Sequence, residues 1–360
     1  MGRPAGCWAG RKDGGVAKPL MAGLRTVVVG SGFASQHVEW LHASEHARVT
    51  ELVFSSNAER ANAVAAKHGV PSVSRELSCV TKSDVDLVVV VSPPSHHAAA
   101  VRTALEAGKL VVCDKPLATN AAEARALARL AAERGLPGMT FFQWRSFAPF
   151  RELRRLLREE SWGALHYIHA DFRHDFLAGK ETAWPWRHRW LEASAGAFAD
   201  MGVHLIDLLP WLLGKKITVE RSVGRIEHST RWHGSTPIRC ETDDSATALF
   251  TFEDAATCGA MHVSRCSQRG RFIKLSAFAE KGEVELHVDV DTLLCTWRRT
   301  GSEAKVEQGK FENPYLGFLR SVRERPLDVG RETHPTLEDG ADAQLVLDSV
   351  SESLRKQLMS

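Results

Sequence analysis

The sequence lacks the cysteine spacing, the long apolar run and the charge excess that would place it in several common classes of protein. Its seven cysteines form no Cys-x-x-Cys pair, so neither a structural zinc site nor a disulfide framework is expected, and reduced thiols in a cytoplasmic protein fit best. No apolar run approaches the roughly 20 residues that a membrane span needs. The first 20 residues hold no apolar signal-peptide core. The net charge of +2 gives no electrostatic argument for nucleic acid or an acidic surface as a partner.

What the chain does have is a glycine turn between a short apolar strand and a helix. The strand is Leu24–Val29, the turn is Gly30–Ser35, and the helix is Gln36–Ala47. In a phosphate-binding loop the first glycine, here Gly30, permits the tight turn, and the second, Gly32, lets the backbone approach a pyrophosphate. Ser35 replaces the third glycine and is still small enough for close packing. Taken alone, the motif could be an ordinary glycine turn.

Apolar strands and helices alternate through the rest of the first half. Further strands are expected at Val49–Phe54, Val85–Val91, Leu110–Cys113 and Met139–Gln143, with helices at Ala58–His68, Ser95–Ala107 and Ala121–Arg134. This alternation predicts a doubly wound parallel sheet, which binds ligands at the carboxyl ends of its strands. Ser55-Ser56, Ser92-Pro93-Pro94 and Asp114-Lys115-Pro116 each follow a strand, so they share that edge.

The end of the second strand favours NADP over NAD. An NAD site usually places Asp or Glu there to bind the ribose hydroxyl. This chain has Ser55, Ser56 and Asn57, with Arg60 one turn further on. Hydroxyls, an amide and a guanidinium can bind a 2′-phosphate, and no carboxylate repels one. The alternative is that these residues only cap the following helix.

From about Ser146 the pattern changes to alternating strands joined by short polar links. They are expected at Leu165–His174, Ile217–Glu227, Ser245–Phe252, Thr257–Ser264, Phe272–Ala279 and Glu283–Val290, with helices at Phe150–Glu159 and Thr336–Leu358. Such a pattern predicts a large, open, mostly antiparallel sheet with one covered face. The expected fold class is therefore an α/β Rossmann domain followed by an α+β domain.

One apolar helix, Gly196–Gly214, interrupts this sheet region and carries Asp200 and His204. The two residues are four apart and lie on one helical face, which Asp207 can share. They could be an acid that orients an imidazole for proton exchange with a substrate hydroxyl. The alternative is a capping acid and a satisfied core histidine. A metal site is disfavoured because no third and fourth ligands are evident.

Together these motifs resemble the Gfo/Idh/MocA family of NAD(P)-dependent oxidoreductases over about residues 24–358. The marks are Gly30-x-Gly32-x-x-Ser35, Ser92-Pro93-Pro94-Ser95-x-His97, Asp114-Lys115-Pro116, Trp186-Arg187 and the Asp200/His204 helix. Asp114 replaces the glutamate usual in the family, and Ala195-Gly196-Ala197 is less glycine-rich than usual. The resemblance implies hydride transfer between a nicotinamide dinucleotide and a CH–OH carbon of a sugar, inositol or related polyol. The residues after the second strand favour NADP(H) over NAD(H) as that dinucleotide.

The resemblance also implies roles for individual residues. Lys115 would polarise the reacting oxygen, His204 would be the acid/base, and Asp200 its partner or a substrate ligand. Lys115, Arg145, Asp200 and His204 would bind substrate. The implied cofactor contacts are Gly30, Ser31, Gly32, Phe33, Ala34, Ser55, Ser56, Asn57, Arg60, Ser92, Pro93, Pro94, His97, Asp114, Lys115, Gln143, Trp186 and Arg187. The segment Trp184–Trp190 could instead be a packing and salt-bridge segment.

We expect four parts along the chain. Residues 1–22 form a flexible extension, with Met21 a possible alternative start. Residues 23–145 form the dinucleotide-binding domain, 146–335 the substrate and oligomerisation domain, and 336–360 a C-terminal helix. By resemblance, a homodimer or homotetramer is expected. Two alternatives stay open: an enzyme that holds NAD(P) tightly and recycles it within each turnover, and a regulator that binds the dinucleotide without chemistry.

Overall fold

The structure, a computed structural model, divides the chain into two compact units. It describes residues 23–158, 162–193, 195–254, 256–268, 270–324 and 334–359, so the expected extension lies outside the described residues. Unit 1 comprises Met1–Ala118, Ala122–Phe141 and Asn313–Ala341, and unit 2 comprises Thr119–Ala121, Phe142–Glu312 and Asp342–Ser360. The chain therefore returns to unit 1 after residue 312, whereas the sequence-based division assigns residues 313–335 to the second domain.

Unit 1 is built on a six-stranded parallel sheet with the order β3-β2-β1-β4-β5-β6, which confirms the predicted Rossmann fold. Its elements are β1 Leu24–Val29, α1 Ala34–Ala43, β2 Ala47–Val53, α2 Ala58–His68, β3 Ser72–Ser74, β4 Leu87–Val90, α3 His97–Glu106, β5 Leu110–Asp114, α4 Ala121–Glu133, β6 Gly138–Phe141 and α8 Leu316–Glu324. Successive side chains of a strand point to opposite faces. Val27 and Val29 accordingly belong to one core and Val28 to the other.

Unit 2 is built on an eight-stranded mixed sheet with the order β16-β15-β14-β13-β7-β12-β11-β8. Its elements are α5 Ala148–Leu157, β7 Leu165–Arg173, α6 Trp190–Ala193, α7 Val203–Leu213, β8 Ile217–Arg225, β9 Thr230–His233, β10 Thr236–Arg239, β11 Ser245–Phe252, β12 Cys258–Ser264, β13 Phe272–Ala279, β14 Gly282–Asp289, β15 Leu294–Arg299, β16 Lys305–Gln308 and α9 Leu337–Met359. Among the described pairs, β7 and β12 run parallel and the others antiparallel, as predicted for a mostly antiparallel sheet.

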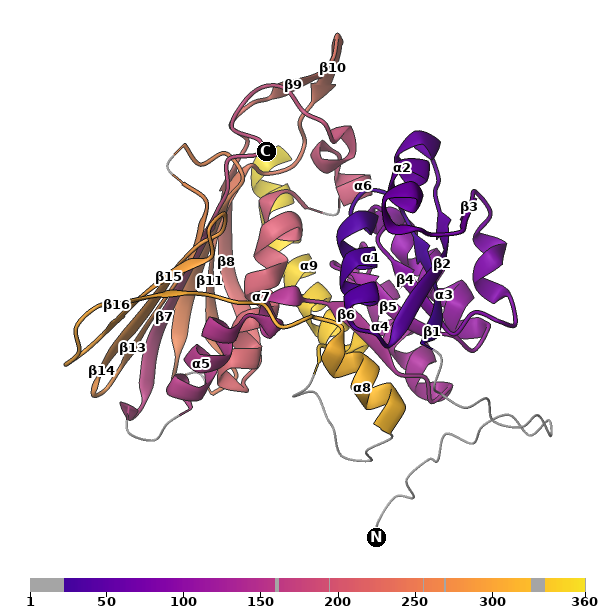
Figure 1. Cartoon of the computed structure of the whole chain (residues 1–360). Coiled ribbons are helices and arrows are strands. Elements are labelled where there is room, and N and C mark those ends of the chain that lie inside the picture. The colour runs from indigo at the N-terminus through magenta and orange to yellow at the C-terminus, as the bar shows by residue number, and fades with distance from the viewer. Residues whose placement is uncertain are drawn as a thin grey trace. The chain divides into compact units, whose positions relative to one another are not determined.

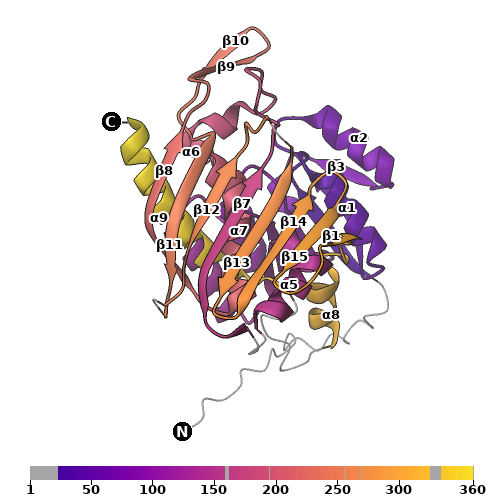
Figure 2. The same cartoon turned by 90° about the vertical axis from the view of Figure 1, so that its left-hand side faces the viewer.

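The helices of unit 2 cover one face of its sheet. Side chains of α5, α7 and α9 join those of the strands in a single core. Figures 1 and 2 show these helices on one side of the sheet, with the opposite face open, and the hairpin of β9 and β10 projecting beyond the strand ends.

The stretch Trp190–Leu213 is long and apolar enough to cross a membrane by length and composition, but 83% of its apolar window is buried. Core helices of soluble proteins pass the same test, so this is weak evidence for a span. Helix α7 is apolar apart from His204 and Asp207, and all of its residues except Pro210 and Leu213 are buried, as expected for a core helix.

Candidate functional site

The glycine turn of unit 1 is shaped by close contact between two strand ends. Gly30 has φ +115°, and a Cβ there would lie 2.6 Å from the backbone nitrogen of Ser92. Gly30 is therefore required both by its backbone conformation and by the approach of the β4 loop. At Gly32 a Cβ would meet nothing within 4 Å, which leaves space above the turn for a ligand. Helix α1 begins at Ala34, two residues earlier than expected.

His97 ties the β4 loop to the segment that carries Lys115. Its ring is 1% exposed, with Nδ1 2.8 Å from the carbonyl oxygen of Pro116 and Nε2 2.7 Å from that of Ser92. Burial lowers the pKa of His97, and the charge of Asp114 opposes this shift. The carboxylate of Asp114 accepts the backbone N–H of Lys115 at 2.8 Å. The structure thus gives His97 and Asp114 supporting contacts at the predicted cofactor edge.

A buried pair that the sequence did not reveal lies close to Asp114. The hydroxyl of Tyr315 and Nδ1 of His37 are 2.6 Å apart, and the His37 ring packs on Phe141 with centroids 4.4 Å apart. Burial, and then the charge of Asp114, raise the pKa of Tyr315 well above its usual value. Burial lowers the pKa of His37, which Asp114 opposes. The segment that returns to unit 1, Asn313–Ala341, therefore adds Tyr315 to the buried core of unit 1 next to the end of β5.

The segment after β2 contains a helix cap, and it is contacted by an arginine that the sequence did not indicate. The side chain of Asn57 accepts the backbone N–H of Arg60 at 2.8 Å, so it caps α2, as the alternative interpretation stated. Arg75 donates to the carbonyl oxygen of Ser55 at 3.1 Å and lies over the ring of Phe54. Ser55, Ser56 and Arg60 are exposed on the same segment.

In unit 2, Asp200 lies in a π-helical turn, Phe198–Gly202, which continues into α7. The sequence predicted an ordinary α-helix there; π turns occur frequently at functional sites. Nε of Arg187 is 3.3 Å from Oδ2 of Asp200, and the two side chains are 7% and 17% exposed. The guanidinium also stacks over the rings of Trp186 and Trp184, at 4.5 and 5.0 Å. Arg187 therefore has the contacts expected if Trp184–Trp190 is a packing and salt-bridge segment: it stacks on two tryptophan rings and forms an ion pair with Asp200.

His204 follows at the start of α7 and is 6% exposed. Its ring lies 6.4 Å from that of Phe142 and 6.3 Å from that of Phe172, measured between centroids. Asp207 belongs to a separate contact: it accepts two hydrogen bonds from Arg145, at 2.9 and 2.5 Å. Arg145 thus has a buried partner, and its predicted contact with substrate stays a prediction, as does that of Gln143 with the cofactor.

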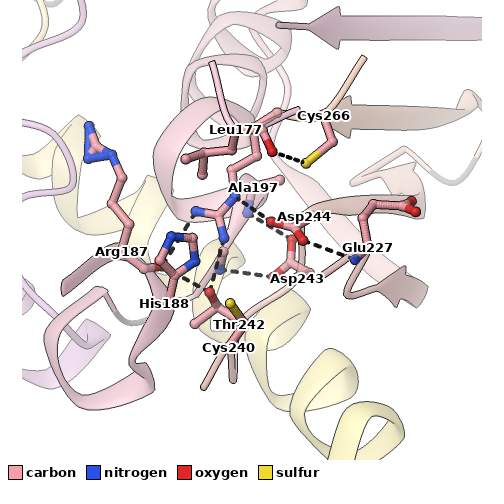
Figure 3. A network of polar contacts seen from close by, with 12 residues as sticks. Leu177, Arg187, His188, Ala197, Glu227, Cys240, Thr242, Asp243, Asp244 and Cys266 are labelled. Atoms are coloured by element: carbon pink, nitrogen blue, oxygen red, sulfur yellow. Dashed lines mark hydrogen bonds and ion pairs between the residues drawn. The ribbon is translucent and has the colours of Figure 1, made fainter. Parts of the chain in front are cut away.

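The backbone of Arg187 meets a buried polar network that the sequence did not reveal (Figure 3). Its members Arg231, Thr242, Asp243, Asp244 and Arg265, together with His188, are fully buried. Nε2 of His188 lies 3.2 Å from the hydroxyl of Thr182. Burial, reinforced by the charges of Arg265 and Arg231, lowers the pKa of His188 to about 3.

The lowered pKa of His188 predicts a loss of stability in acid. Protons bind His188 in the unfolded chain below about pH 6.5 but in the folded protein only near pH 3, so stability falls as pH drops through that window. The contribution approaches about 1.4 kcal/mol per pH unit. We expect His188→Gln to reduce the slope of unfolding free energy against pH, measured by urea denaturation between pH 7 and 5. An unchanged slope in this variant would contradict the assignment.

The described residues contain no group of three or more His, Cys, Asp or Glu side chains that could hold a metal ion. Within each unit the structure brings predicted residues together: Gly30, Ser92, His97 and Asp114 in unit 1, and Arg187 and Asp200 in unit 2. Lys115 belongs to unit 1 and His204 to unit 2.

Comparison with known proteins gives the chain its family. A family model described as an oxidoreductase family with an NAD-binding Rossmann fold matches residues 24–142, and the GFO/IDH/MocA C-terminal domain matches residues 150–285. Two curated proteins are similar to this chain. Levoglucosan dehydrogenase of Pseudarthrobacter phenanthrenivorans is 22% identical over 86% of this chain and 88% of that protein.

Trans-1,2-dihydrobenzene-1,2-diol dehydrogenase of Macaca fuscata fuscata is 30% identical over 64% of this chain. The match covers 65% of that dehydrogenase, just under two thirds of its length. A structure of levoglucosan dehydrogenase with NADH and L-sorbose has a TM-score of 0.80 at 19% identity and covers 94% of this chain and 98% of that one. The chain therefore belongs to the Gfo/Idh/MocA family of NAD-binding oxidoreductases.

Proposed function

We propose that the protein is an NADP(H)-dependent dehydrogenase that acts on a CH–OH group of a sugar, inositol or related polyol. The observation that carries the proposal is the Arg187–Asp200 ion pair, one turn before His204 on a buried helix. A carboxylate held beside a guanidinium can accept hydrogen bonds from substrate hydroxyls, and a histidine one turn later can exchange a proton. The relatives named above are dehydrogenases of levoglucosan and of a dihydrodiol, which supports the substrate class.

The residues of unit 1 fit a dinucleotide. Gly30 has no room for a side chain, while Gly32 leaves the face of the turn open. The hydroxyl of Ser92 is buried without a hydrogen-bond partner among the described residues, so a ligand group at this edge could satisfy it. Bound there, NAD(P) would supply the hydride-accepting and hydride-donating ring.

The chain's own residues would stabilise charge, transfer the proton and orient the substrate. Lys115 as an ammonium stabilises negative charge that develops on the reacting oxygen. His204 removes the proton from that oxygen during oxidation and returns it during reduction. Asp200 orients the substrate by accepting from a hydroxyl, and Arg187 holds Asp200 in place.

The NADP preference rests on the residues after β2. No carboxylate follows this strand directly. Ser55, Ser56 and Arg60 are exposed there, Arg75 donates to the carbonyl oxygen of Ser55, and these side chains could bind a 2′-phosphate. The solved relative carries NADH, so this preference belongs to the proposal for this chain alone.

Ser55→Asp is expected to reverse the preference. A carboxylate at this position would repel the 2′-phosphate and accept from the ribose hydroxyls of NAD. We expect the Kd for NADPH to rise by about 10- to 100-fold, the value of one or two charge-assisted hydrogen bonds, while NADH binds as well or better. Fluorescence titration of both reduced cofactors measures this, with Ser302→Asp in the β15–β16 turn as a charge-matched control. Unchanged NADPH binding would argue against the 2′-phosphate site.

A panel of polyols, mixed with purified protein and NADP or NAD, tests the proposed activity. Absorbance that grows at the band of the reduced nicotinamide, with a CH–OH substrate, is the expected result. Dinucleotide that is released only on denaturation, without net redox change, would instead indicate an enzyme that recycles its cofactor. Cofactor binding without any turnover would indicate a regulator.

We also propose that the protein is a cytoplasmic homodimer or homotetramer. Strands of the unit 2 sheet carry apolar side chains that are at least one third exposed, among them Val223, Leu249, Phe278 and Leu294. Exposed apolar side chains on a sheet face are a feature of protein interfaces. The six described cysteines are free thiols, which suits a reducing compartment. Sedimentation equilibrium that gives a single 39.7 kDa species would contradict the oligomer, and thiols found oxidised in the cell would contradict the compartment.

A further inference from the structure

Asp243 clamps the start of the helix that carries Asp200 and His204. Its Oδ1 accepts the backbone N–H of Gly196 and its Oδ2 that of Ala197, both at 2.9 Å, and its carbonyl oxygen lies 3.0 Å from the same Ala197 nitrogen. The first N–H groups of a helix have no partner within the helix, and a carboxylate there also meets the positive end of the helix dipole. Figure 3 shows Asp243 facing Ala197.

Gly196 makes this close approach possible. Its φ is outside the left-handed region, so backbone strain is not the reason for glycine here. A Cβ on Gly196 would instead overlap the backbone of Asp243. The carbonyl oxygen of Gly196 in turn accepts the backbone N–H of Asp200 at 3.1 Å, so one hydrogen bond separates the clamped residue from Asp200.

The neighbouring residue, Thr242, holds the other member of the ion pair. Its hydroxyl donates to the carbonyl oxygen of Arg187 at 2.9 Å and accepts from Arg265 at 3.0 Å. The side chain of Arg187 extends away from the network while its backbone stays beside Thr242 (Figure 3), and that side chain pairs with Asp200 at 3.3 Å. Two consecutive residues thus hold the two partners of one ion pair.

The charges around the clamp are balanced and sealed from water. Asp244 lies 3.0 Å from Arg231 and 3.5 Å from Arg265, and all three side chains, like Asp243, are fully buried. Both arginines therefore pair with Asp244, and the charge of Arg265 also opposes the rise that burial causes in the pKa of Asp243. Buried charges are costly unless they are paired and hydrogen-bonded, and such networks can fix one conformation where an apolar core would allow several. A helix start of this kind has little freedom to shift.

We propose that Asp243 is a positioning residue that, with Thr242, fixes the Arg187–Asp200 pair in the geometry that the reaction needs. The inference rests on the proposed function, because it assigns Asp200 a role toward substrate. Asp243 acts through the helix start and Thr242 through the backbone of Arg187. The network belongs to unit 2, whereas most of the predicted dinucleotide contacts belong to unit 1, so we expect Asp243 and Thr242 to affect turnover more than dinucleotide binding.

Asp243→Asn tests the clamp with minimal change of shape. An amide can accept one of the two N–H groups but presents its own N–H₂ to the other. A displacement of catalytic groups by about 1 Å costs up to about 100-fold in rate, so we expect kcat to fall by about tenfold or more. The Kd for NADPH should change less than kcat does, because most of the predicted cofactor contacts lie in unit 1. The double variant Asp200→Asn/Asp243→Asn should be no slower than Asp200→Asn alone, because the clamp acts through Asp200.

Asp254→Asn is the matched control, since Asp254 also accepts two neighbouring backbone N–H groups, those of Ala256 and Thr257, in the β11–β12 turn. Hydrogen exchange of the peptide 196–204 gives a readout independent of turnover, and it should accelerate in Asp243→Asn but not in Asp254→Asn. Should Asp243→Asn not fold, Thr242→Val removes only the hydroxyl and should lower kcat by about threefold or more.

Wild-type rates in Asp243→Asn and Thr242→Val would overturn the positioning role. So would a loss of kcat that multiplies with that of Asp200→Asn, because a general weakening of the fold would then explain it. Wild-type protein that turns over no polyol would instead overturn the proposed function, and the positioning role with it, while exchange at 196–204 would still report whether Asp243 clamps the helix.

Discussion

Replacing Lys115 by methionine is expected to lower kcat by about 10²- to 10³-fold, the cost of losing one preorganised donor to a developing oxyanion. Lys115 directly follows the last residue of β5, and its backbone N–H is held by the carboxylate of Asp114. Methionine keeps the length and most of the volume of the side chain but removes the ammonium. The predicted loss therefore reports charge at the reacting oxygen and not a cavity.

The measurement needs turnover and cofactor binding side by side. Steady-state kinetics with the best substrate of the polyol panel give kcat, and fluorescence titration of NADPH gives Kd, which should stay within about threefold if the loss is confined to the reacting groups. Lys82→Met, which removes a surface lysine of unit 1 that pairs with Glu51, is the control for a lost positive charge. Full activity of Lys115→Met would remove Lys115 from the catalytic set.

Strands whose apolar residues alternate were predictable almost to the residue. The predicted strands Ser245–Phe252 and Phe272–Ala279 have the same bounds as β11 and β13. One face of each strand packs on helices and the other is open, so apolar residues occur at every second position of the sequence. Short or edge strands carry no such signal. Of the strands that escaped prediction, β3 has three residues, none of them buried, and β16, at the sheet edge, has no buried residue either.

The candidate site likewise has a part that the sequence could predict and a part that it could not. The glycine turn and the strand-end motifs are local features, so the sequence revealed them. The partners of these residues are distant in the chain: Tyr315 meets His37 across 278 residues, and Asp243 meets Gly196 across 47. Contacts of this kind depend on how the elements pack, and no local pattern encodes them. The π turn at Phe198–Gly202 was equally hidden, because the spacing of apolar residues in an all-apolar helix fits either geometry.

The structure gives the two acids of the Asp200/His204 helix different basic partners. Asp200 and His204 were expected to lie on one face, which Asp207 can share; Asp200 pairs with Arg187 and Asp207 with Arg145. Each carboxylate therefore has its own guanidinium, which leaves the imidazole of His204 as the group on this helix suited to proton exchange. That division gives the histidine its own test.

His204→Gln is expected to lower kcat/KM by about 10²- to 10⁴-fold in both reaction directions, the usual contribution of a general acid/base. The direction of the pH dependence distinguishes this role from a merely structural one. A base must be unprotonated to accept the hydroxyl proton, so wild-type oxidation should rise with pH through the pKa of the imidazole. An acid must be protonated to donate, so reduction should fall over the same range. Glutamine cannot titrate, and both dependences should flatten.

Asp200→Asn provides the matched comparison on the same helix. It should weaken substrate binding and slow turnover, while the rates keep their wild-type pH dependence because the imidazole of His204 is unchanged.

Added imidazole should restore part of the activity of His204→Ala, because the lost group is a proton carrier and the truncation leaves a cavity beside Phe142 and Phe172. A His204→Gln enzyme that keeps the wild-type pH dependence would transfer the acid/base role to Lys115, whose pKa would then govern both limbs. The two variants, Lys115→Met and His204→Gln, together decide which residue stabilises the oxygen and which moves its proton.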